Sequence, residues 1–273
     1  MAPVFMELFS LSTILLARTV VGASIASGRA GIDRLQLRHD GSSFISSLAF
    51  KHKLRVCNAY PYKLPMDVFL GKDKLTQEPL AYKSCDEFSQ PLKAGDKLDF
   101  KVGDSTAGTF SVAELPNNDA TLVLVIYLHD TSSTAVAFES HVFSNLVNAQ
   151  IAVIDAFRGA TKATPRIRDF SDAKTDRDEE LRYDSVVAVN PGRYEVILQD
   201  SEGKVESKHE LVALNRQSYI VVRCGVESQQ GQSYPQDLIV YPHSDASVLM
   251  GAATPMHSLL AVVIAVLFLA VVS

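Results

Sequence analysis

Three adjacent residues, Gly103-Asp104-Ser105, form the one motif in the chain that points to nucleophilic catalysis. In one class of esterases and acetyl-transfer enzymes a Gly-Asp-Ser carries the nucleophile, and an Asp-x-x-His places the base and its orienting carboxylate. The chain has 7 histidines, and none has an aspartate three residues before it; Glu206, before His209, is the nearest match. The motif also follows a turn-rich segment and does not open a helix. We therefore expect a β-turn here and no catalytic residue.

An SGNH-like esterase that uses Ser105 remains the enzymatic alternative. The sequence contains no phosphate-binding glycine loop, HExxH or nucleophile elbow. His129-Asp130 and Asp67 stand alone and are typical of loop or edge positions. We expect a protein that is not an enzyme and that needs no cofactor.

The cysteines predict a disulfide rather than a metal site, because neither a CxxC pair nor a histidine cluster is present. The chain has 3 cysteines, and proximity favours a Cys57–Cys85 bridge, which would stabilise the fold by roughly 3–4 kcal/mol. Cys224 is then a buried free thiol or an intermolecular link. The acidic stretch 168–180 lacks EF-hand spacing and its central glycine, so a solvated loop is expected there.

The charge balance excludes nucleic acid as a partner. There are 26 basic and 31 acidic residues, a net charge of −5, spread along the chain. Phosphate backbones require a basic stripe, and none is present. Trp is also absent, which disfavours a tryptophan platform for sugar rings.

Both ends of the chain are hydrophobic and predict export. Residues 1–23 resemble a signal peptide that ends in Val21-Gly22-Ala23. The apolar tail 259–272 falls short of the ~20 residues that a spanning helix needs, and no Lys or Arg follows it. A polar spacer precedes this tail, so residues 244–273 are typical of a glycolipid-anchor signal with Ser244, Ser247 or Gly251 as the attachment residue. A retained tail anchor and a secreted product are the alternatives.

The chain repeats itself after 97 residues. The strand-like segment Leu54–Tyr60 matches Ile151–Phe157, and Leu122–Ile126 matches Tyr219–Arg223 at the same offset. Between them, the turn around Gly95 matches the turn around Gly192. We conclude that the chain arose by internal duplication.

Each copy predicts an all-β domain. Short strands alternate with Gly, Pro, Asn and Asp turns, which is typical of an antiparallel, Ig-like β-sandwich. Two tandem sandwiches are expected, at residues 50–130 and 149–243, with a short joint from 130 to 148. The apolar run Leu122–Leu128 predicts a central strand covered on both faces. The two sandwiches are expected to pack against each other.

The repeats resemble the paired β domains of the alginate O-acetylation accessory (AlgF-like) family over about residues 50–242. The resemblance is carried by Leu54–Tyr60, Asp67–Leu70, Ala94-Gly95, the strand at Leu122, and Phe138–Ser144 before the second repeat. It implies an exported two-domain protein without catalytic residues that couples acetylation components by protein contacts. An uncharacterised extracellular β-sandwich family shares the start at Val56–Ala59. The hydrophobic tail departs from the alginate family, which places the alginate role itself in question.

These features predict a lipid-anchored binding or adaptor protein on the extracellular face of the plasma membrane. Its expected partners are a protein or a polysaccharide at the cell surface or wall, with the membrane reached through the tail. Accessory action in polysaccharide O-acetylation and a host-facing adhesin are the alternatives.

Overall fold

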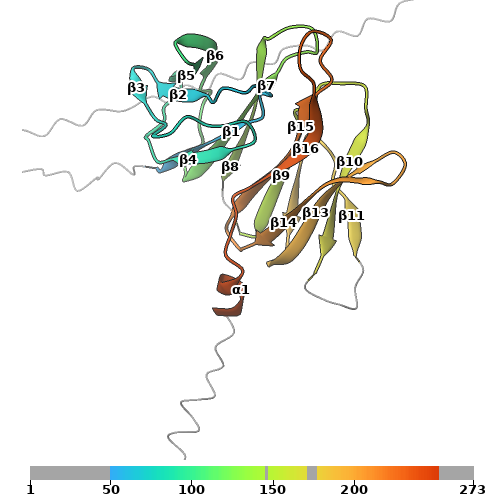
Figure 1. Ribbon diagram of the computed structural model, residues 1–273. Helices are drawn as coiled ribbons and strands as arrows, with labels where there is room; N and C mark the ends of the chain where they lie inside the picture. Colours follow the sequence, from blue (N-terminus) through green and yellow to red (C-terminus); the bar gives the residue numbers. More distant parts are fainter. Residues whose placement is uncertain (1–49, 145–146, 171–176, 252–273) are drawn as a thin grey trace, which may run out of the picture. The chain divides into compact units, whose positions relative to one another are not determined.

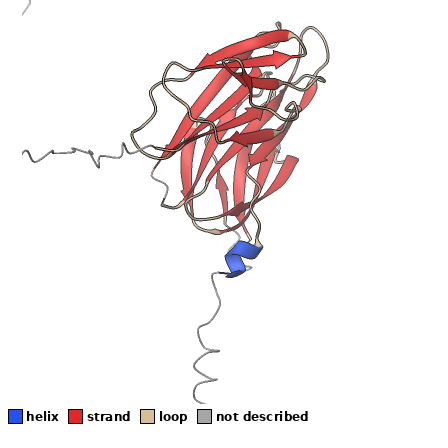
Figure 2. Cartoon of the chain, turned by 90° about the vertical axis from the view of Figure 1, so that its left-hand side faces the viewer, coloured by secondary structure: helices blue, strands red, loops and turns tan. Residues whose placement is uncertain are grey.

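Strands make up most of the chain that the computed structural model describes, which is residues 50–144, 147–170 and 177–251. Figures 1 and 2 show β-strands throughout this part, with one short helix, α1 (Ser247–Gly251), after the last strand. No helix of the described residues is long and apolar enough to cross a membrane. The predicted signal peptide, 1–23, and the apolar tail, 259–272, lie outside the described residues.

The first sandwich consists of two four-stranded sheets. One has the order β4-β1-β7-β8, built from Cys85–Phe88, His52–Asn58, Ala120–Leu128 and Val136–Ser144. The other has the order β3-β2-β5-β6, built from Asp73–Lys74, Asp67–Leu70, Lys97–Val102 and Ser105–Ser111. All neighbours are antiparallel except β1 and β7, which run parallel.

The second sandwich repeats this order strand for strand. The sheet β12-β9-β15-β16 is built from Ser185–Val189, Ala149–Asp155, Ser218–Val226 and Tyr234–Tyr241. The sheet β11-β10-β13-β14 is built from Asp178–Glu180, Ala163–Asp169, Gly192–Asp200 and Val205–Ala213. The second sandwich also contains one parallel pair of strands, β9 with β15. The expected pair of β-sandwiches is therefore confirmed, with this parallel pair as a refinement of the antiparallel prediction.

The strand register confirms the duplication. Leu54 lies opposite Leu122 in the first sandwich, and Ile151 lies opposite Tyr219 in the second. Each residue of the second pair lies 97 positions after its counterpart in the first pair. The parallel pairing and its register are therefore the same in both copies.

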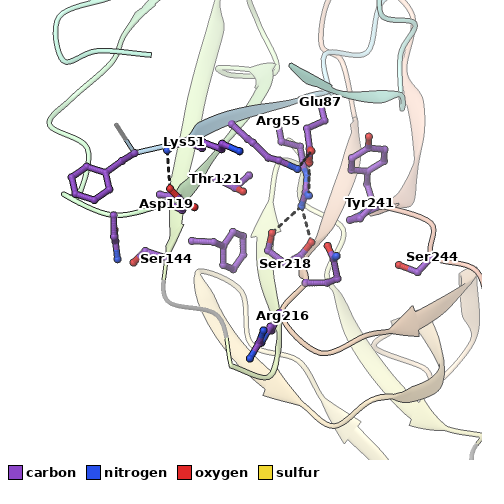
Figure 3. Close-up of a pocket in the computed structure, with 17 residues that line it drawn as sticks. Lys51, Arg55, Glu87, Asp119, Thr121, Ser144, Arg216, Ser218, Tyr241 and Ser244 are labelled. Carbon is purple, nitrogen blue, oxygen red and sulfur yellow. Dashed lines mark hydrogen bonds and ion pairs between the residues drawn. The ribbon is translucent and has the colours of Figure 1, made fainter. Parts of the chain in front are cut away.

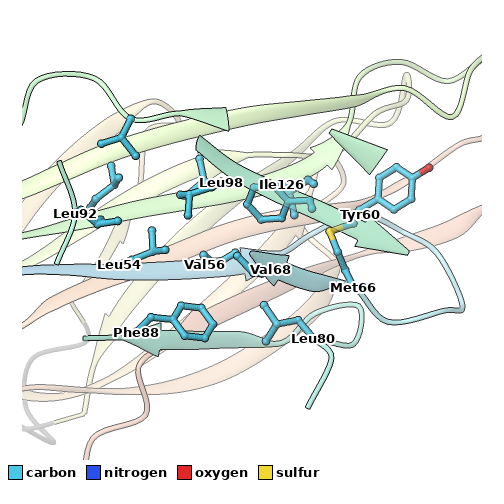
Figure 4. Packing of buried hydrophobic residues seen from close by; sticks show 14 of the residues in the cluster. Leu54, Val56, Tyr60, Met66, Val68, Leu80, Phe88, Leu92, Leu98 and Ile126 are labelled. Carbon is cyan, nitrogen blue, oxygen red and sulfur yellow. The ribbon is translucent and has the colours of Figure 1, made fainter. Parts of the chain in front are cut away.

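Alternation along the strands builds a separate core in each sandwich. In β1, Leu54 and Val56 point into the first core, where they pack with Met66, Val68 and Leu98 (Figure 4). In β9, Ile151 and Val153 occupy the equivalent places in the second core. Because side chains alternate along a strand, the residues between them face the opposite side of the sheet.

A third apolar cluster joins the two sandwiches, and we call it the seam. It is formed by the opposite faces of the β1 and β7 sheet and the β9 and β15 sheet, with Cys57, Val123, Val125, Ile154, Ile220 and Val222 among its members. Both sheets are thus covered on two sides, and every residue from Leu122 to Leu128 is buried. This confirms the prediction of a strand covered on both faces.

The expected joint from 130 to 148 is largely wrong, because it contains β8. This strand pairs with β7 over its whole length: Ser144 lies opposite Ala120 at one end, and Val136 lies opposite Leu128 at the other. Its Phe138 packs on the first core and its Phe143 lies in the seam. The first sandwich thus continues to Ser144 and the second begins at Ala149, which leaves a much shorter connection.

Candidate ligand-binding site

The structure places Gly103-Asp104-Ser105 in the hairpin turn between β5 and β6. Val102 pairs with Ser105, so Gly103 and Asp104 are the two turn residues. Gly103 has a φ of 58°, which suits the first central position of a type II′ hairpin. Ser105 is exposed and hydrogen-bonds to no histidine among the described residues. The motif therefore has a sufficient structural explanation.

The cysteines lie at the seam. Cys57 and Cys85 face each other directly on β1 and β4 and are joined by a disulfide. Cys224 on β15 is free and fully buried. Burial raises the pKa of its thiol to about 11, so the thiolate is disfavoured. Of the two roles considered for Cys224, the buried free thiol is the one that fits.

The three residues considered for lipid attachment differ in their surroundings. Ser244 is half-buried, and its hydroxyl lies 2.9 Å from the hydroxyl of the buried Tyr219. Ser247 is exposed at the start of α1, and Gly251 ends that helix. Attachment itself stays a prediction.

A pocket of about 1120 Å³ opens where the two sandwiches meet (Figure 3). The first sandwich contributes the beginnings of β1 and β7, the end of β8, and Glu87 of β4. The second contributes the turn before β15 with the first residue of that strand, and the last residue of β16 with the chain after it; these include Arg216, Ser218, Tyr241 and Ser244. Both sandwiches are therefore needed to form it.

Arg55 is the central residue of this pocket. It follows Leu54 on β1, so alternation turns its side chain away from the first core and toward the second sandwich. It is 3% exposed, and its Nη1 donates to the carbonyl oxygen of Ser218 at 2.7 Å and to the Ser218 hydroxyl at 3.2 Å. Its guanidinium also lies 5.4 Å from the centre of the Tyr241 ring. A charged side chain thus ties the two sandwiches together.

Glu87 balances part of this charge. It lies directly opposite Arg55 on β4, and its Oε2 accepts from Arg55 Nη2 at 2.8 Å. Its other oxygen accepts from Lys53 Nζ at 2.7 Å. Burial acts to raise the pKa of Glu87, but the hydrogen bonds and charges of Lys53 and Arg55 outweigh it and lower the pKa. Two cations therefore share one carboxylate.

Two further cations lie at the rim. Lys51 and Arg216 are both exposed, and neither side chain forms an ion pair with any residue in the described ranges. The backbone N–H of Lys51 donates to Asp119 Oδ1 at 2.8 Å. The lining thus carries four basic side chains and two carboxylates, a formal charge of +2.

The second copy of the repeat lacks this basic cluster. At the offset of 97, Lys51, Lys53 and Arg55 correspond to Asn148, Gln150 and Ala152. Ala152 is buried and contributes an ordinary apolar contact to the seam. The second sandwich thus forms without these charges, so the fold itself does not require them.

Sequence reasoning missed this site because lysines and arginines on a strand usually mark its solvated face. A signal was present in the comparison of the two copies. The alternation Lys51-x-Lys53-x-Arg55 is basic where the repeat has Asn, Gln and Ala. Only the packing of one sandwich on the other shows that Arg55 is buried.

Part of the acidic stretch 168–180 is described. Asp178 pairs with Arg166 at 2.8 Å and with Arg168 at 2.9 Å, so this carboxylate bridges two basic side chains of β10. Residues 171–176 lie outside the described ranges. Within the described residues, no group of three or more His, Cys, Asp or Glu side chains is arranged to hold a metal ion.

Comparison with solved structures finds chains that this one is similar to, among them a carbohydrate-binding module. Neither a family model nor a curated protein matches the chain. A solved structure of a family 26 carbohydrate-binding module from Eubacterium rectale Amy13K, in complex with maltoheptaose, covers 71% of this chain and 99% of its own. The identity is 6% and the TM-score is 0.24, a value too low to establish a shared fold. The likeness therefore assigns no role to the site.

Proposed function

We propose that the chain is a non-catalytic binding or adaptor protein of the cell surface and that the pocket at the seam is its ligand site. The observation that carries the proposal is the buried Arg55. Placing a charge in an apolar contact costs free energy, and its pairing with Glu87 only partly offsets that cost. In the second copy, Ala152 occupies the position that corresponds to Arg55 and packs in the seam without a charge.

The pocket is large enough to admit a ligand and has the mixed composition of a binding site. Ligand sites commonly measure ~300–1,000 Å³ and combine apolar walls with a few polar groups. This pocket measures about 1120 Å³ and has Phe50, Phe143 and Tyr241 beside its charged residues. A surface polysaccharide or a segment of a partner protein suits a pocket of this size.

The proposed location rests on the hydrophobic ends of the sequence. Treating intact cells with phosphatidylinositol-specific phospholipase C should release the protein, as read on a blot. Release supports a glycolipid anchor on the extracellular face. A protein that leaves the membrane only with detergent contradicts it and favours a retained tail, once lipase-resistant anchors have been excluded.

The ligand site can be tested by a bulky substitution that fills part of the pocket and leaves its charge unchanged. Ser144→Trp adds bulk at the pocket wall, whereas Ser111→Trp adds the same bulk at the exposed end of β6. The full chain should bind polysaccharides prepared from its own cell surface, or an adaptor partner, and Ser144→Trp should lose that binding. Equal binding by both variants would show that the pocket is not the site.

A second candidate is an accessory role in alginate-type O-acetylation, supported by the resemblance over residues 50–242. Deleting the protein should then lower the acetyl content of the surface polysaccharide. Restoring it as Ser105→Ala should recover full acetylation, since Ser105 lies in a hairpin turn. Failure of Ser105→Ala to restore acetylation would instead favour acetyl transfer by Ser105 itself.

A further inference from the structure

We infer that the ligand of the pocket is an acidic polysaccharide, and that Arg216 and Lys51 bind two different negatively charged groups along it. This inference rests on the proposed function, because it names the chemistry that the same pocket recognises. Figure 3 shows Lys51 and Arg216 at opposite ends of the pocket, on different sandwiches. An extended chain with negative groups at intervals reaches both cations, whereas a small ligand with one negative group reaches only one of them.

Arg216 has a backbone conformation that its residue type rarely adopts. Its φ is 60°, and this left-handed region is uncommon for residues other than Gly, Asn and Asp. Among the described residues, Lys83 and Asp184 are the other non-glycine residues with a positive φ. Asp184 is of a type that tolerates it, and Lys83 gains an ion pair with Asp237 of the other sandwich at 2.6 Å.

No such contact compensates the strain at Arg216. Its side chain is exposed, lines the pocket, and forms no hydrogen bond or ion pair with any residue in the described ranges. Strained backbone conformations of this kind cluster at ligand-binding sites, where they position a functional group. The free guanidinium offers parallel N–H donors that suit an oxyanion, so we assign Arg216 a contact with a carboxylate or sulfate group of the ligand.

The charge of the pocket contrasts with that of the whole chain. The protein has a net charge of −5, whereas the pocket lining has a formal charge of +2. Lys53 and Arg55 already exceed the single negative charge of Glu87 that they share. A concave site with this surplus attracts anions and raises their local concentration.

The neutral part of the lining favours a sugar chain as the carrier of these negative groups. Thr121, Ser144 and Gln217 line the pocket, and their side chains form no hydrogen bond with any described residue. Such side chains both donate and accept, so they suit the hydroxyl groups of sugar rings. Phe50, which is 39% exposed, and the half-buried Tyr241 add aromatic surface for the rings themselves. An acidic peptide has few hydroxyl groups and matches this lining less well.

The class of ligand can be tested with polymers of known charge. The full chain, released from cells or extracted in detergent, is titrated with dextran, carboxymethyl-dextran, dextran sulfate and poly-glutamate. We expect at least one acidic dextran to bind at least about tenfold more tightly than dextran and poly-glutamate, the scale of one charge-assisted hydrogen bond. This binding should weaken as salt is added, because salt screens surface charges.

The tighter of the two acidic dextrans identifies the negative group as a carboxylate or a sulfate. The inference is overturned if neither binds more tightly than dextran. It is also overturned if poly-glutamate binds as tightly as the better acidic dextran, because the pocket would then recognise charge without recognising sugar.

Arg216→Asn and Lys83→Asn form a matched pair of variants. Each removes one positive charge and places Asn, which tolerates a positive φ, at an exposed left-handed position; Lys83 does not line the pocket. Arg216→Asn should lose at least about tenfold in affinity for the acidic dextran, while its midpoint of urea unfolding should not fall. Lys83→Asn should bind like the unmodified protein. Equal weakening in both variants, or full binding by Arg216→Asn, overturns the role of Arg216.

Lys51→Gln tests whether the two cations bind separate groups. Alone it should also lose at least about tenfold in affinity. Free-energy effects of distant, independent sites add, so Lys51→Gln with Arg216→Asn should lose about a hundredfold or more. A double variant no weaker than either single variant would mean that both cations act on one group, which overturns the extended arrangement.

The proposed function and this inference can fail separately. If Ser144→Trp loses binding to surface polysaccharide while Arg216→Asn binds it like Lys83→Asn, the inference fails and the proposed function stands. If Ser144→Trp binds every ligand as well as Ser111→Trp does, the proposed function fails as well.

Discussion

Arg55 places a guanidinium at the end of a contact that is otherwise apolar. Its partners come from two sandwiches, Glu87 on one and Ser218 on the other. Arginine stays charged in proteins, so its burial has to be compensated by hydrogen bonds and an opposite charge. The same contacts that compensate the charge also fix the guanidinium beneath the pocket, where it contributes to the positive potential.

Removing the charge of Glu87 alone should therefore be more harmful than removing the pair. Glu87→Gln leaves Arg55 buried without its counter-charge, and we expect a loss of about 3 kcal/mol in the free energy of unfolding, the low end for a broken buried pair because Glu87 is partly exposed. Arg55→Leu with Glu87→Leu removes both charges and should lose much less. Urea unfolding of the three proteins measures this. A double variant as unstable as Glu87→Gln would contradict the argument.

The same pair predicts how stability depends on pH. The pKa of Glu87 is lower in the folded protein than its usual value, so the folded state binds this proton less readily. The resulting stabilisation is fully present above the ordinary glutamate pKa of ~4.3 and is lost as the pH falls through the lowered value. The stability difference between the unmodified protein and Glu87→Gln should shrink below that pH. A difference that stays constant from pH 7 to pH 3 would contradict this assignment.

Between strands, a few residues with special backbone or side-chain geometry determine where elements end and bend. The side-chain oxygen of Asn58 accepts from the N–H of Tyr60 at 3.0 Å, and that of Asp155 accepts from Phe157 at 3.1 Å. Both close a turn at the end of the repeated strand, as expected of Asn and Asp. Gly225 has a different role, at the irregularity between Cys224 and Val226 where β15 pairs with β16.

Substitution of Gly225 should be costly for two reasons. Its φ is +121°, and a Cβ there would approach the backbone oxygen of Pro235 to 2.6 Å. We expect Gly225→Ala to lower the free energy of unfolding by about 3 kcal/mol, the upper end for backbone strain.

Gly203→Ala is the matched control. Gly203 also has a positive φ, but the nearest atom to a Cβ added there is Gln199 Nε2, at 3.7 Å. Its cost should be about 1 kcal/mol. Similar losses in both variants, measured by denaturant unfolding, would show that steric contact adds nothing at Gly225.

The sequence predicted the elements better than the site, and the reason is the range of the interactions. Strand period, turn residues and the repeat are local signals, so the sandwiches and the paired copies were found. β8 was missed because Val136–Ser144 follows a Thr-Ser-Ser-Thr cluster and resembles a linker until it pairs with β7. The pocket depends on residues as distant as Arg55 and Ser218, whose contact exists only after the sandwiches pack.

At the scale of the whole described chain, three apolar layers follow one another: two cores and the seam between them. The seam is built from strands that also supply the cores, since alternate residues of β7 and β15 face either side. Each sandwich therefore presents an apolar face that needs the other as its cover. The two copies should behave as one cooperative unit, although each has its own core.

A buried charge in the middle of the seam should break that cooperativity. Val222 is fully buried on β15 and belongs to the seam, away from the pocket lining. Val222→Asp places an unpaired carboxylate among apolar side chains, which costs several kcal/mol unless the surfaces separate and admit water. We expect the unmodified protein to unfold in one calorimetric transition and Val222→Asp to unfold in two, or at a strongly lowered temperature. The conservative change Val222→Ala controls for lost packing and should keep a single transition, with a loss of about 1–2 kcal/mol, as for other truncations of a buried valine.

Because the pocket needs both sandwiches, Val222→Asp should also abolish ligand binding, whereas Val222→Ala should retain it. Binding that survives separation of the two transitions would mean that one sandwich carries the site alone.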